Sequence, residues 1–209
     1  MTDAIPHLPE DYPTTRKALV EKFTTGHLRS KMRRPYQADE MIYATNGHAL
    51  VRCPATDAMQ EMNFHDEENW ENWQSDFEEK LGADSSEAES IDLRPVLETL
   101  HRLRTVDNHE YHTCSQCGNN VEGRIIGQKY APAAIVYWRG EFWNPGILTR
   151  SVAGAVATEE TMTATAYPVG EWSNLSEASP LVLDVGEVRL GIMMMAPREP
   201  DAYELYPVN

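Results

Sequence analysis

Apolar and polar positions form a hairpin pattern on both sides of Asn46-Gly47. Residues 41–45 and 49–53 are rich in apolar and β-prone side chains, and Asn-Gly stands between them. Asn and Gly reach positive φ at the least cost, so this dipeptide between two such runs is a strong local signal for a tight turn. The sequence therefore predicts a two-stranded hairpin from Met41 to Cys53, closed by Pro54.

Three segments have helical spacing of apolar residues. Thr14 to Thr25 is predicted as an amphipathic helix with Thr14 as N-cap and a stop at Gly26. Leu93 to Arg104 follows Asp92 as a cap, with Pro95 in the first turn. The third helix, Gly146 to Ala157, follows Asn144-Pro145. The expected core stripes are Val96, Leu97, Leu100 and Leu103 in the second helix and Leu148, Val152, Ala155 and Val156 in the third.

Further strands are expected between and after these helices. Residues 124–128 and 133–138 precede a tight turn at Arg139-Gly140-Glu141, and residues 161–167 alternate threonine with apolar side chains. A last ribbon, residues 181–185 and 188–195, turns at Gly186-Glu187. The pattern predicts an α+β fold with antiparallel sheets.

Composition divides the chain of 209 residues, 41% of them hydrophobic, into four parts. Residues 1–55 form a helix-plus-hairpin half, 56–90 an acidic insertion, 91–123 a helix and a Cys/His loop, and 124–209 a second helix-plus-sheet half. The insertion has twelve acids against one base, so it carries a formal −11 of the total −15. Helix one with its hairpin also resembles helix three with the final ribbon, a faint internal repeat.

The remainder of the chain is nearly balanced in charge and has a basic run. Arg29, Lys31, Arg33 and Arg34 follow the first helix, which itself carries Arg16, Lys17 and Lys22. A local basic face is what duplex DNA requires, since phosphate contacts supply most of its non-specific affinity. A basic face is therefore expected on a globally acidic protein.

The stretch Ala44-Thr45-Asn46-Gly47-His48-Ala49-Leu50 resembles the Ala-Thr-Asp-Gly-His-Arg-Leu segment of bacterial DNA polymerase sliding clamps. Residues 140–197 are similar to the closing half of a clamp domain, where the family ends on a Met-Pro-Met strand and this chain reads Ile-Met-Met-Met-Ala-Pro. The resemblance implies a clamp-like α+β fold built from two helix-plus-strands halves.

The same resemblance implies functional residues. A groove for a partner peptide would be lined by Thr45, Gly47, His48, Leu50, Met194, Met195 and Pro197. Ala49 stands where the family has arginine, which changes the expected peptide preference. Double-stranded DNA would be contacted by Arg16, Lys17, Lys22, Arg102, Arg104 and Arg150. A clamp ring needs more domains than this chain supplies, so we expect a homo-oligomer or a clamp fold without a ring.

Cysteine and histidine gather between residues 109 and 118. Cys114 and Cys117 form a Cys-x-x-Cys knuckle followed by glycine, and His109 and His112 precede it. This set suits a structural zinc ion, with Cys53, His48 or His101 as substitutes for one of the histidines. Free thiols in a loop, or a redox pair, are the alternatives.

Enzyme signatures are not found. The sequence has no Gly-rich phosphate loop, no Gly-x-Ser-x-Gly elbow and no His-Glu-x-x-His pattern. It also has no apolar run of membrane-spanning length and no secretory signal pattern, and an odd cysteine count, so we expect a cytoplasmic protein. We expect a non-enzymatic clamp-like module of DNA metabolism, encoded by a phage or mobile element. A zinc-stabilised interaction protein with an acidic partner surface and no DNA role is the alternative, and a metal-dependent hydrolase is a third.

Overall fold

The computed structural model describes residues 5–24, 33–65, 81, 88–113, 120–167, 181–194 and 203–208. Within them, a seven-stranded antiparallel sheet has the order β1-β2-β3-β11-β10-β9-β4. Its strands are β1 (Tyr36–Ala38), β2 (Met41–Thr45), β3 (Ala49–Pro54), β4 (Glu89–Asp92), β9 (Thr163–Tyr167), β10 (Leu181–Val185) and β11 (Val188–Ile192). The antiparallel α+β class is confirmed.

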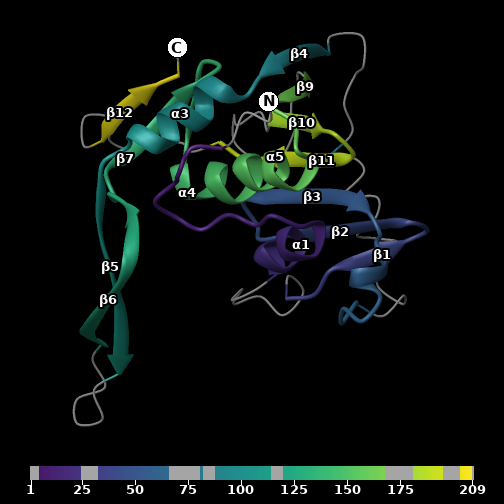
Figure 1. Ribbon diagram of the computed structural model, residues 1–209, viewed down its shortest axis with the longest axis horizontal. Helices are drawn as coiled ribbons and strands as arrows, with labels where there is room; N and C mark the ends of the chain where they lie inside the picture. Colours follow the sequence, from purple (N-terminus) through teal and green to yellow (C-terminus); the bar gives the residue numbers. More distant parts are fainter. Residues whose placement is uncertain are drawn as a thin grey trace.

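Two smaller sheets complete the strands (Figure 1). One contains β7 (Ala134–Trp138) between β8 (Glu141–Trp143) and β12 (Glu204–Pro207), and β12 runs parallel to β7. This parallel pair is an exception to the expected antiparallel pattern. The other is a long hairpin of β5 (Thr105–Thr113) and β6 (Asn120–Tyr130), which projects from the body of the molecule. We call β5 and β6 the arm.

The helices contribute to the main hydrophobic core together with the large sheet. They are α1 (Arg16–Thr24), α3 (Arg94–Arg102) and a continuous run of α4 (Pro145–Leu148), a π-helical turn η5 (Thr149–Ala153) and α5 (Gly154–Glu159). A short 3-10 turn, η2 (Asp57–Met59), follows β3. Leu19, Val20 and Phe23 of α1 and Leu148, Val152 and Val156 of the α4–α5 run are buried in one core with Val51, Leu183 and Leu190 of the sheet.

The helix boundaries follow local capping chemistry. Thr15, rather than Thr14, caps α1, since its Oγ1 accepts a hydrogen bond from the backbone N–H of Ala18 at 3.2 Å. Asn144 caps α4 as expected, because its Oδ1 accepts from the N–H of Ile147 at 3.1 Å. All four residues of each expected core stripe are buried. The π-helical turn inside the third helix was not expected.

The predicted hairpin is present, with its turn one residue later than expected. Thr45 pairs with Leu50, and the central turn residues are Gly47 and His48, with positive φ at Gly47 alone (83°). The Asn46 side chain accepts hydrogen bonds from the N–H groups of His48 and Ala49. Asn46 thus acts through its side chain and does not adopt positive φ. The two-residue turn with positive φ at both positions occurs instead at Arg139-Gly140, between β7 and β8.

The two halves of the large sheet are arranged alike. Helix α1 followed by β1, β2 and β3 forms one half, and α4–α5 followed by β9, β10 and β11 forms the other. They meet at the central pair of β3 and β11, where Val51 lies opposite Leu190. From this pair outward, the order is β3, β2, β1 on one side and β11, β10, β9 on the other, and β4 extends only the second half. The internal repeat therefore corresponds to two similar units in space.

The acidic insertion is tied to this framework at its described residues. Met59 is buried in the main core, Leu81 is buried on the opposite face of the sheet, and β4 begins at Glu89. The segment thus contributes to the body. The acidic stretches 66–80 and 82–87 lie outside the described residues.

Candidate functional site

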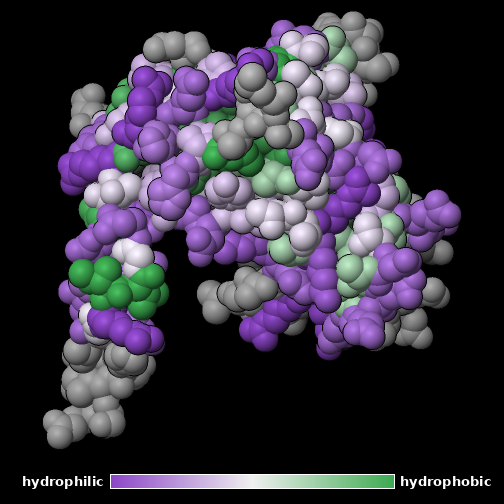
Figure 2. All heavy atoms as spheres, in the orientation of Figure 1, coloured by the Kyte–Doolittle hydropathy of each residue, from purple (hydrophilic) through white to green (hydrophobic). Residues whose placement is uncertain are grey.

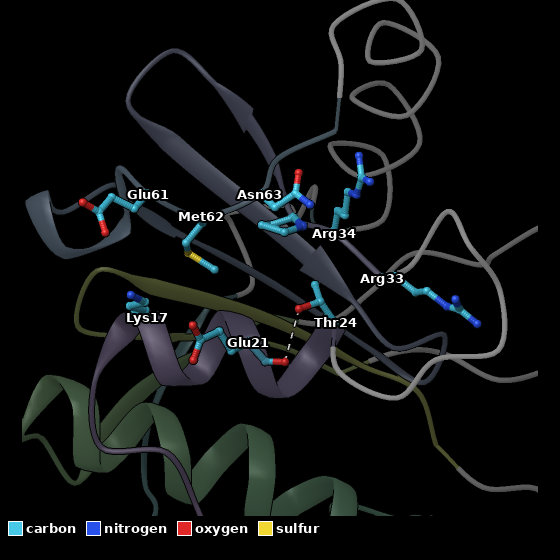
Figure 3. Close-up of a pocket in the computed structure, with 9 residues that line it drawn as sticks. Lys17, Glu21, Thr24, Arg33, Arg34, Glu61, Met62 and Asn63 are labelled. Carbon is cyan, nitrogen blue, oxygen red and sulfur yellow. Dashed lines mark hydrogen bonds between the residues drawn. The ribbon is translucent and has the colours of Figure 1, made fainter.

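A groove of about 330 Å³ lies between α1 and the segments that flank β1 (Figure 3). Its lining includes Lys17, Glu21 and Thr24 from α1, Arg33, Arg34 and Pro35 from the approach to β1, and Glu61, Met62 and Asn63 from the turn after η2. The Thr24 hydroxyl donates to the carbonyl of Glu21 at 3.2 Å. Helix α1 therefore forms the floor of a polar groove.

The groove is more basic than the rest of the protein. Three basic and two acidic side chains leave it a formal charge of +1, on a chain of −15. Guanidinium and ammonium groups are the usual ligands of phosphate oxygens, and a local positive surface attracts anions even on an acidic protein. Lys17 was predicted to contact DNA, and the structure brings Arg33 and Arg34 of the basic run to the same groove.

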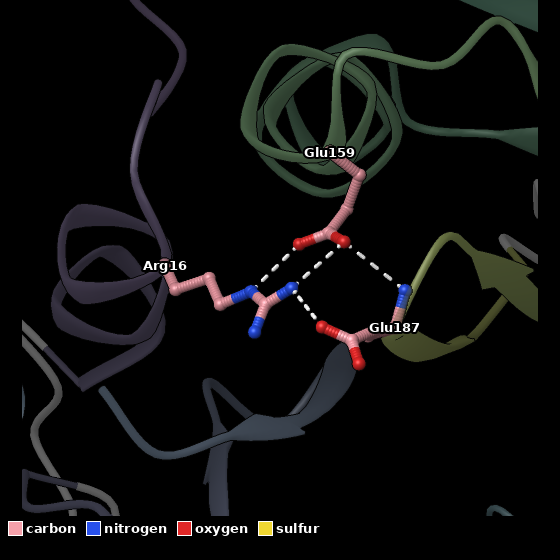
Figure 4. Close-up of polar contacts among 3 residues, drawn as sticks. All are labelled: Arg16, Glu159 and Glu187. Carbon is pink, nitrogen blue, oxygen red and sulfur yellow. Dashed lines mark hydrogen bonds and ion pairs between the residues drawn. The ribbon is translucent and has the colours of Figure 1, made fainter.

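Arg16, also predicted to contact DNA, has a structural role (Figure 4). Its guanidinium binds both carboxylate oxygens of Glu159, at 2.7 and 2.9 Å, and Glu187 at 2.6 Å. The Glu159 side chain is only 7% exposed. The hydrogen bond that Arg16 donates to Glu159 is the main reason why the pKa of Arg16 lies above its ordinary value. Arg16 thus links α1 to the end of α5 and to the β10–β11 turn.

The other predicted DNA residues are spread over the helical side. Arg102 is exposed at the end of α3, where its Nε donates to the carbonyl of Glu98. Arg104 forms an ion pair with Glu204 of β12 at 2.5 Å. Arg150 lies in the π-helical turn and donates to the carbonyl of Gly146 at 2.9 Å. None of these three lines the basic groove around Lys17.

The structure brings together the two segments from which the peptide groove was predicted. The carbonyl of His48 accepts a hydrogen bond from the N–H of Met193 at 2.9 Å, so the hairpin tip lies beside the segment that holds Met194. Gly47 and His48 are exposed, whereas Thr45 is buried and its hydroxyl donates to the carbonyl of Ala49. Met195 and Pro197 lie outside the described residues. Thr45 therefore supports the turn, and the exposed rim consists of Gly47 and His48.

Leu50 is half-buried on the sheet. It packs against a small apolar cluster of Tyr36, Tyr43 and Leu81 on the face of the sheet opposite the main core. Leu81 is fully buried there, and a Cβ placed on Gly191 would lie 3.0 Å from its Cδ2. Leu81 of the acidic segment therefore occupies part of the space beside the half-buried Leu50.

A polar cluster lies beside Leu81 on the same face. Arg189 binds Asp184 through two hydrogen bonds of 2.6 and 2.7 Å and lies 5.0 Å from the centre of the Tyr167 ring. Its Nη1 donates to the carbonyl of Leu81 at 3.3 Å. Burial disfavours ionisation of Asp184, but the hydrogen bonds from Arg189 and Tyr167 outweigh it, so the pKa of Asp184 lies below its ordinary value. This cluster holds Leu81 in place.

The predicted zinc ligands divide between described and undescribed residues. Cys114 and Cys117 lie outside the described residues, and for His112 only the backbone, paired with Val121, is described. The His109 ring contacts the carbonyl of Gly123 at 3.2 Å and the Glu122 carboxylate at 3.5 Å. At roughly 3.3 Å per residue, the backbone of His109 lies about 13 Å along β5 from the strand end at Thr113.

The alternative ligands named from the sequence are engaged elsewhere. Cys53 is buried in the main core, and burial raises the pKa of its thiol to about 12. His101 contacts the carbonyl of His7 at 2.7 Å, and His48 is at the hairpin tip. Among the residues that the structure describes, no group of three or more His, Cys, Asp or Glu side chains could hold a metal ion. A zinc site thus stays a prediction centred on Cys114 and Cys117.

Comparison with known proteins gives no relative. No protein-family model matches the chain, and no curated protein or solved structure matches it significantly. Across the described ranges, no helix has the length and apolar character needed to cross a membrane. Functional inference therefore rests on the fold and the sites above.

Sequence reasoning missed three of the contributors to these sites. Glu159 and Glu187 bind Arg16 from positions more than 140 residues away, and Leu81 was counted only as part of an acidic segment. Arg33 and Arg34 were noted as a basic run, and that run was the signal that could have located the groove.

Proposed function

We propose that this protein is a non-enzymatic, clamp-like module of DNA metabolism that binds the phosphate backbone and recruits a partner peptide. The observation that carries the proposal is the pair of helix-plus-three-strand units that meet at β3 and β11, with both helical elements on one face of the sheet. Two such units are what the resemblance to sliding clamps implies for a clamp domain. The surface assigned to the partner peptide and the surface assigned to DNA then lie on different elements.

The DNA contact is assigned to the basic groove over α1. Lys17, Arg33 and Arg34 line it, and Lys22 is exposed on the same helix as Lys17. Contacts of this kind read the phosphate backbone without reading sequence. We therefore expect weak binding of duplex DNA that does not depend on base sequence and that weakens steeply as salt rises.

The partner contact is assigned to the rim formed by Gly47, His48 and Met194. These residues lie where β3 and the end of β11 meet. Apolar anchors dominate peptide recognition in such grooves, so the space that Leu81 fills near Leu50 bears directly on affinity. A partner peptide would have to bind beside Leu81 or displace it.

A salt titration of duplex binding tests the DNA assignment. Lys17→Ala should weaken binding and lower the slope of log affinity against log salt by about one, because one phosphate contact is lost. Lys129→Ala, which removes the same charge from the arm, is the matched control and should leave both quantities unchanged. Binding that is absent at low salt, or equally affected by both variants, contradicts the proposal.

The second candidate function is a zinc-stabilised interaction module without a DNA role. The arm favours it, since β5 and β6 are paired as far as Thr113 and Asn120, on either side of the segment that holds Cys114 and Cys117. Near-stoichiometric zinc that is lost in Cys114→Ser, together with no salt-dependent DNA binding, would favour this function over the clamp-like one.

A further inference from the structure

The arm carries two of the four large hydrophobic side chains that are exposed in the described part of the chain. Ile125 is 56% and Ile126 is 55% exposed, both on β6. Figure 2 shows hydrophobic residues gathered on the arm, between hydrophilic surfaces above and below. Exposed isoleucines side by side on a projecting ribbon differ from isolated surface apolar residues and indicate a contact surface.

A bulge places these two isoleucines together. Asn108 and His109 are neighbours on β5, yet they pair with Gly127 and Ile125, so Ile126 is an extra residue on β6. In a regular strand, adjacent side chains point to opposite faces. A bulge redirects them, and such bulges are typical of functional positions. The irregular register therefore turns two adjacent isoleucines into one patch.

The arm is also incomplete as a folded unit. β5 and β6 form a sheet of their own with two strands. An isolated two-stranded hairpin is marginally stable in water, and stable ribbons gain further strands or pack an apolar face against another element. Among the residues that the structure describes, the isoleucine face therefore has no packing partner of the kind that a ribbon of this length needs.

The net charge of the arm permits contact with a second copy of the arm. The described arm has three acids and two bases, a formal −1, whereas the whole chain has −15. Two copies of the body repel each other strongly, whereas two arms of −1 each repel only weakly. Ile125 is five residues, about 16 Å, from the arm's root at Tyr130. Two arms that lie antiparallel and cross at this point keep their roots about 30 Å apart, well beyond a Debye length of about 8 Å.

We propose that two copies of this chain associate through their arms, face to face about a two-fold axis, with Ile125 and Ile126 at the centre of the contact. Two-fold dimers are the commonest symmetric assemblies, and each arm then buries the apolar face of the other. A ribbon about 36 Å long offers an interface at the low end of specific contacts, so the dimer is weak, with a dissociation constant of roughly 10 µM. The proposal holds whether or not the protein binds DNA.

Sedimentation of the full-length chain over a dilution series around roughly 10 µM tests this. The buffer contains a reductant, so that cysteines do not form disulfides between chains. The mass should double with rising concentration. Ile125→Thr with Ile126→Thr keeps β-branched residues on the strand but removes apolar surface, and should raise the dissociation constant at least about tenfold.

The matched control replaces the other two exposed large hydrophobic residues. Tyr137 and Leu205 lie on the three-stranded sheet and are 41% and 49% exposed, so Tyr137→Thr with Leu205→Thr makes the same kind of change outside the arm. This double variant should dimerise like the parent chain. If it dissociates while the arm variant does not, the contact lies on the body and the proposal is overturned.

Hydrogen exchange separates loss of the contact from loss of the arm. Amides of β5 and β6 in the parent chain should become more protected as concentration rises, and those of β2 and β3 should not change. A chain that is monomeric at every concentration, or a dimer whose arm amides are insensitive to dilution, overturns the proposal.

Discussion

The β2–β3 and β5–β6 hairpins are built alike but supported differently. Both are antiparallel and both contain a glycine with positive φ, Gly47 in the first and Gly127 in the second. In β2 and β3, the side chains of Ile42, Val51 and Cys53 are fully buried beneath α1. The arm exposes its isoleucines and forms a sheet of its own. Backbone pairing is thus common to both hairpins, and burial decides which of them unfolds cooperatively with the body.

The largest expected difference is in hydrogen exchange at low concentration. Amides of β2 and β3 should exchange only through global unfolding, whereas those of β5 and β6 should exchange through local opening. We expect protection factors at least about a thousandfold higher in the packed hairpin. Similar protection in both, measured by exchange and mass spectrometry on dilute protein, would remove the distinction.

The same substitution should have unequal effects in the two hairpins. Ile42→Ala should lower the free energy of unfolding by about 2–5 kcal/mol, because it leaves a cavity in the core. Ile125→Ala should change it by less than about 0.5 kcal/mol in dilute protein, since the side chain is already in water. Urea unfolding followed by circular dichroism measures both, and equal losses would mean that the arm unfolds together with the body.

Ion pairs sharpen the comparison further. Glu159→Gln leaves Arg16, 19% exposed, with only Glu187, and should cost roughly 2 kcal/mol, less than the value for a fully buried pair. Glu110→Gln removes the partner of Arg124, which is 80% exposed on the arm, and should cost about 0–0.5 kcal/mol. Urea midpoints in low and high salt test both, and only the arm pair should lose its effect in high salt.

The smallest expected difference concerns the glycines. Gly47→Ala forces alanine to φ 83° and should cost about 1 kcal/mol in urea unfolding. Gly127→Ala is also strained, at φ 152°, but should alter only local exchange of the arm. A global loss from Gly127→Ala as large as that from Gly47→Ala would contradict the separation of arm and body.

Local signals account for the elements that sequence predicted well. Pro95 and Asn144-Pro145 mark helix starts because a proline in the first turn, and the Asn144 side-chain cap, depend on neighbouring residues alone. The strand β5 was missed because Thr105 to Thr113 contains only two apolar side chains, Val106 and Tyr111, and it was interpreted as a Cys/His loop. Strand β12 has only four residues and depends on its distant partner β7. Such pairings have no local pattern.

The candidate sites show the same limit. Lys17 and the basic run could be picked out because charge clusters are visible in sequence. Arg16 looks identical to Lys17 in that respect, yet Glu159 binds it from the end of another helix. Leu81 could not be assigned to the space beside Leu50, since a single leucine among acids has no periodicity.

The central pair of the large sheet has a consequence for synthesis of the chain. β3 ends at Pro54, and its partner β11 ends at Ile192. About 140 residues must therefore be translated before the open edge of β3 is covered, which takes roughly 7–28 s at about 5–20 residues per second. Through that interval β3 is an unpaired apolar edge. The nascent chain, rather than the finished protein, is the form most in need of a chaperone.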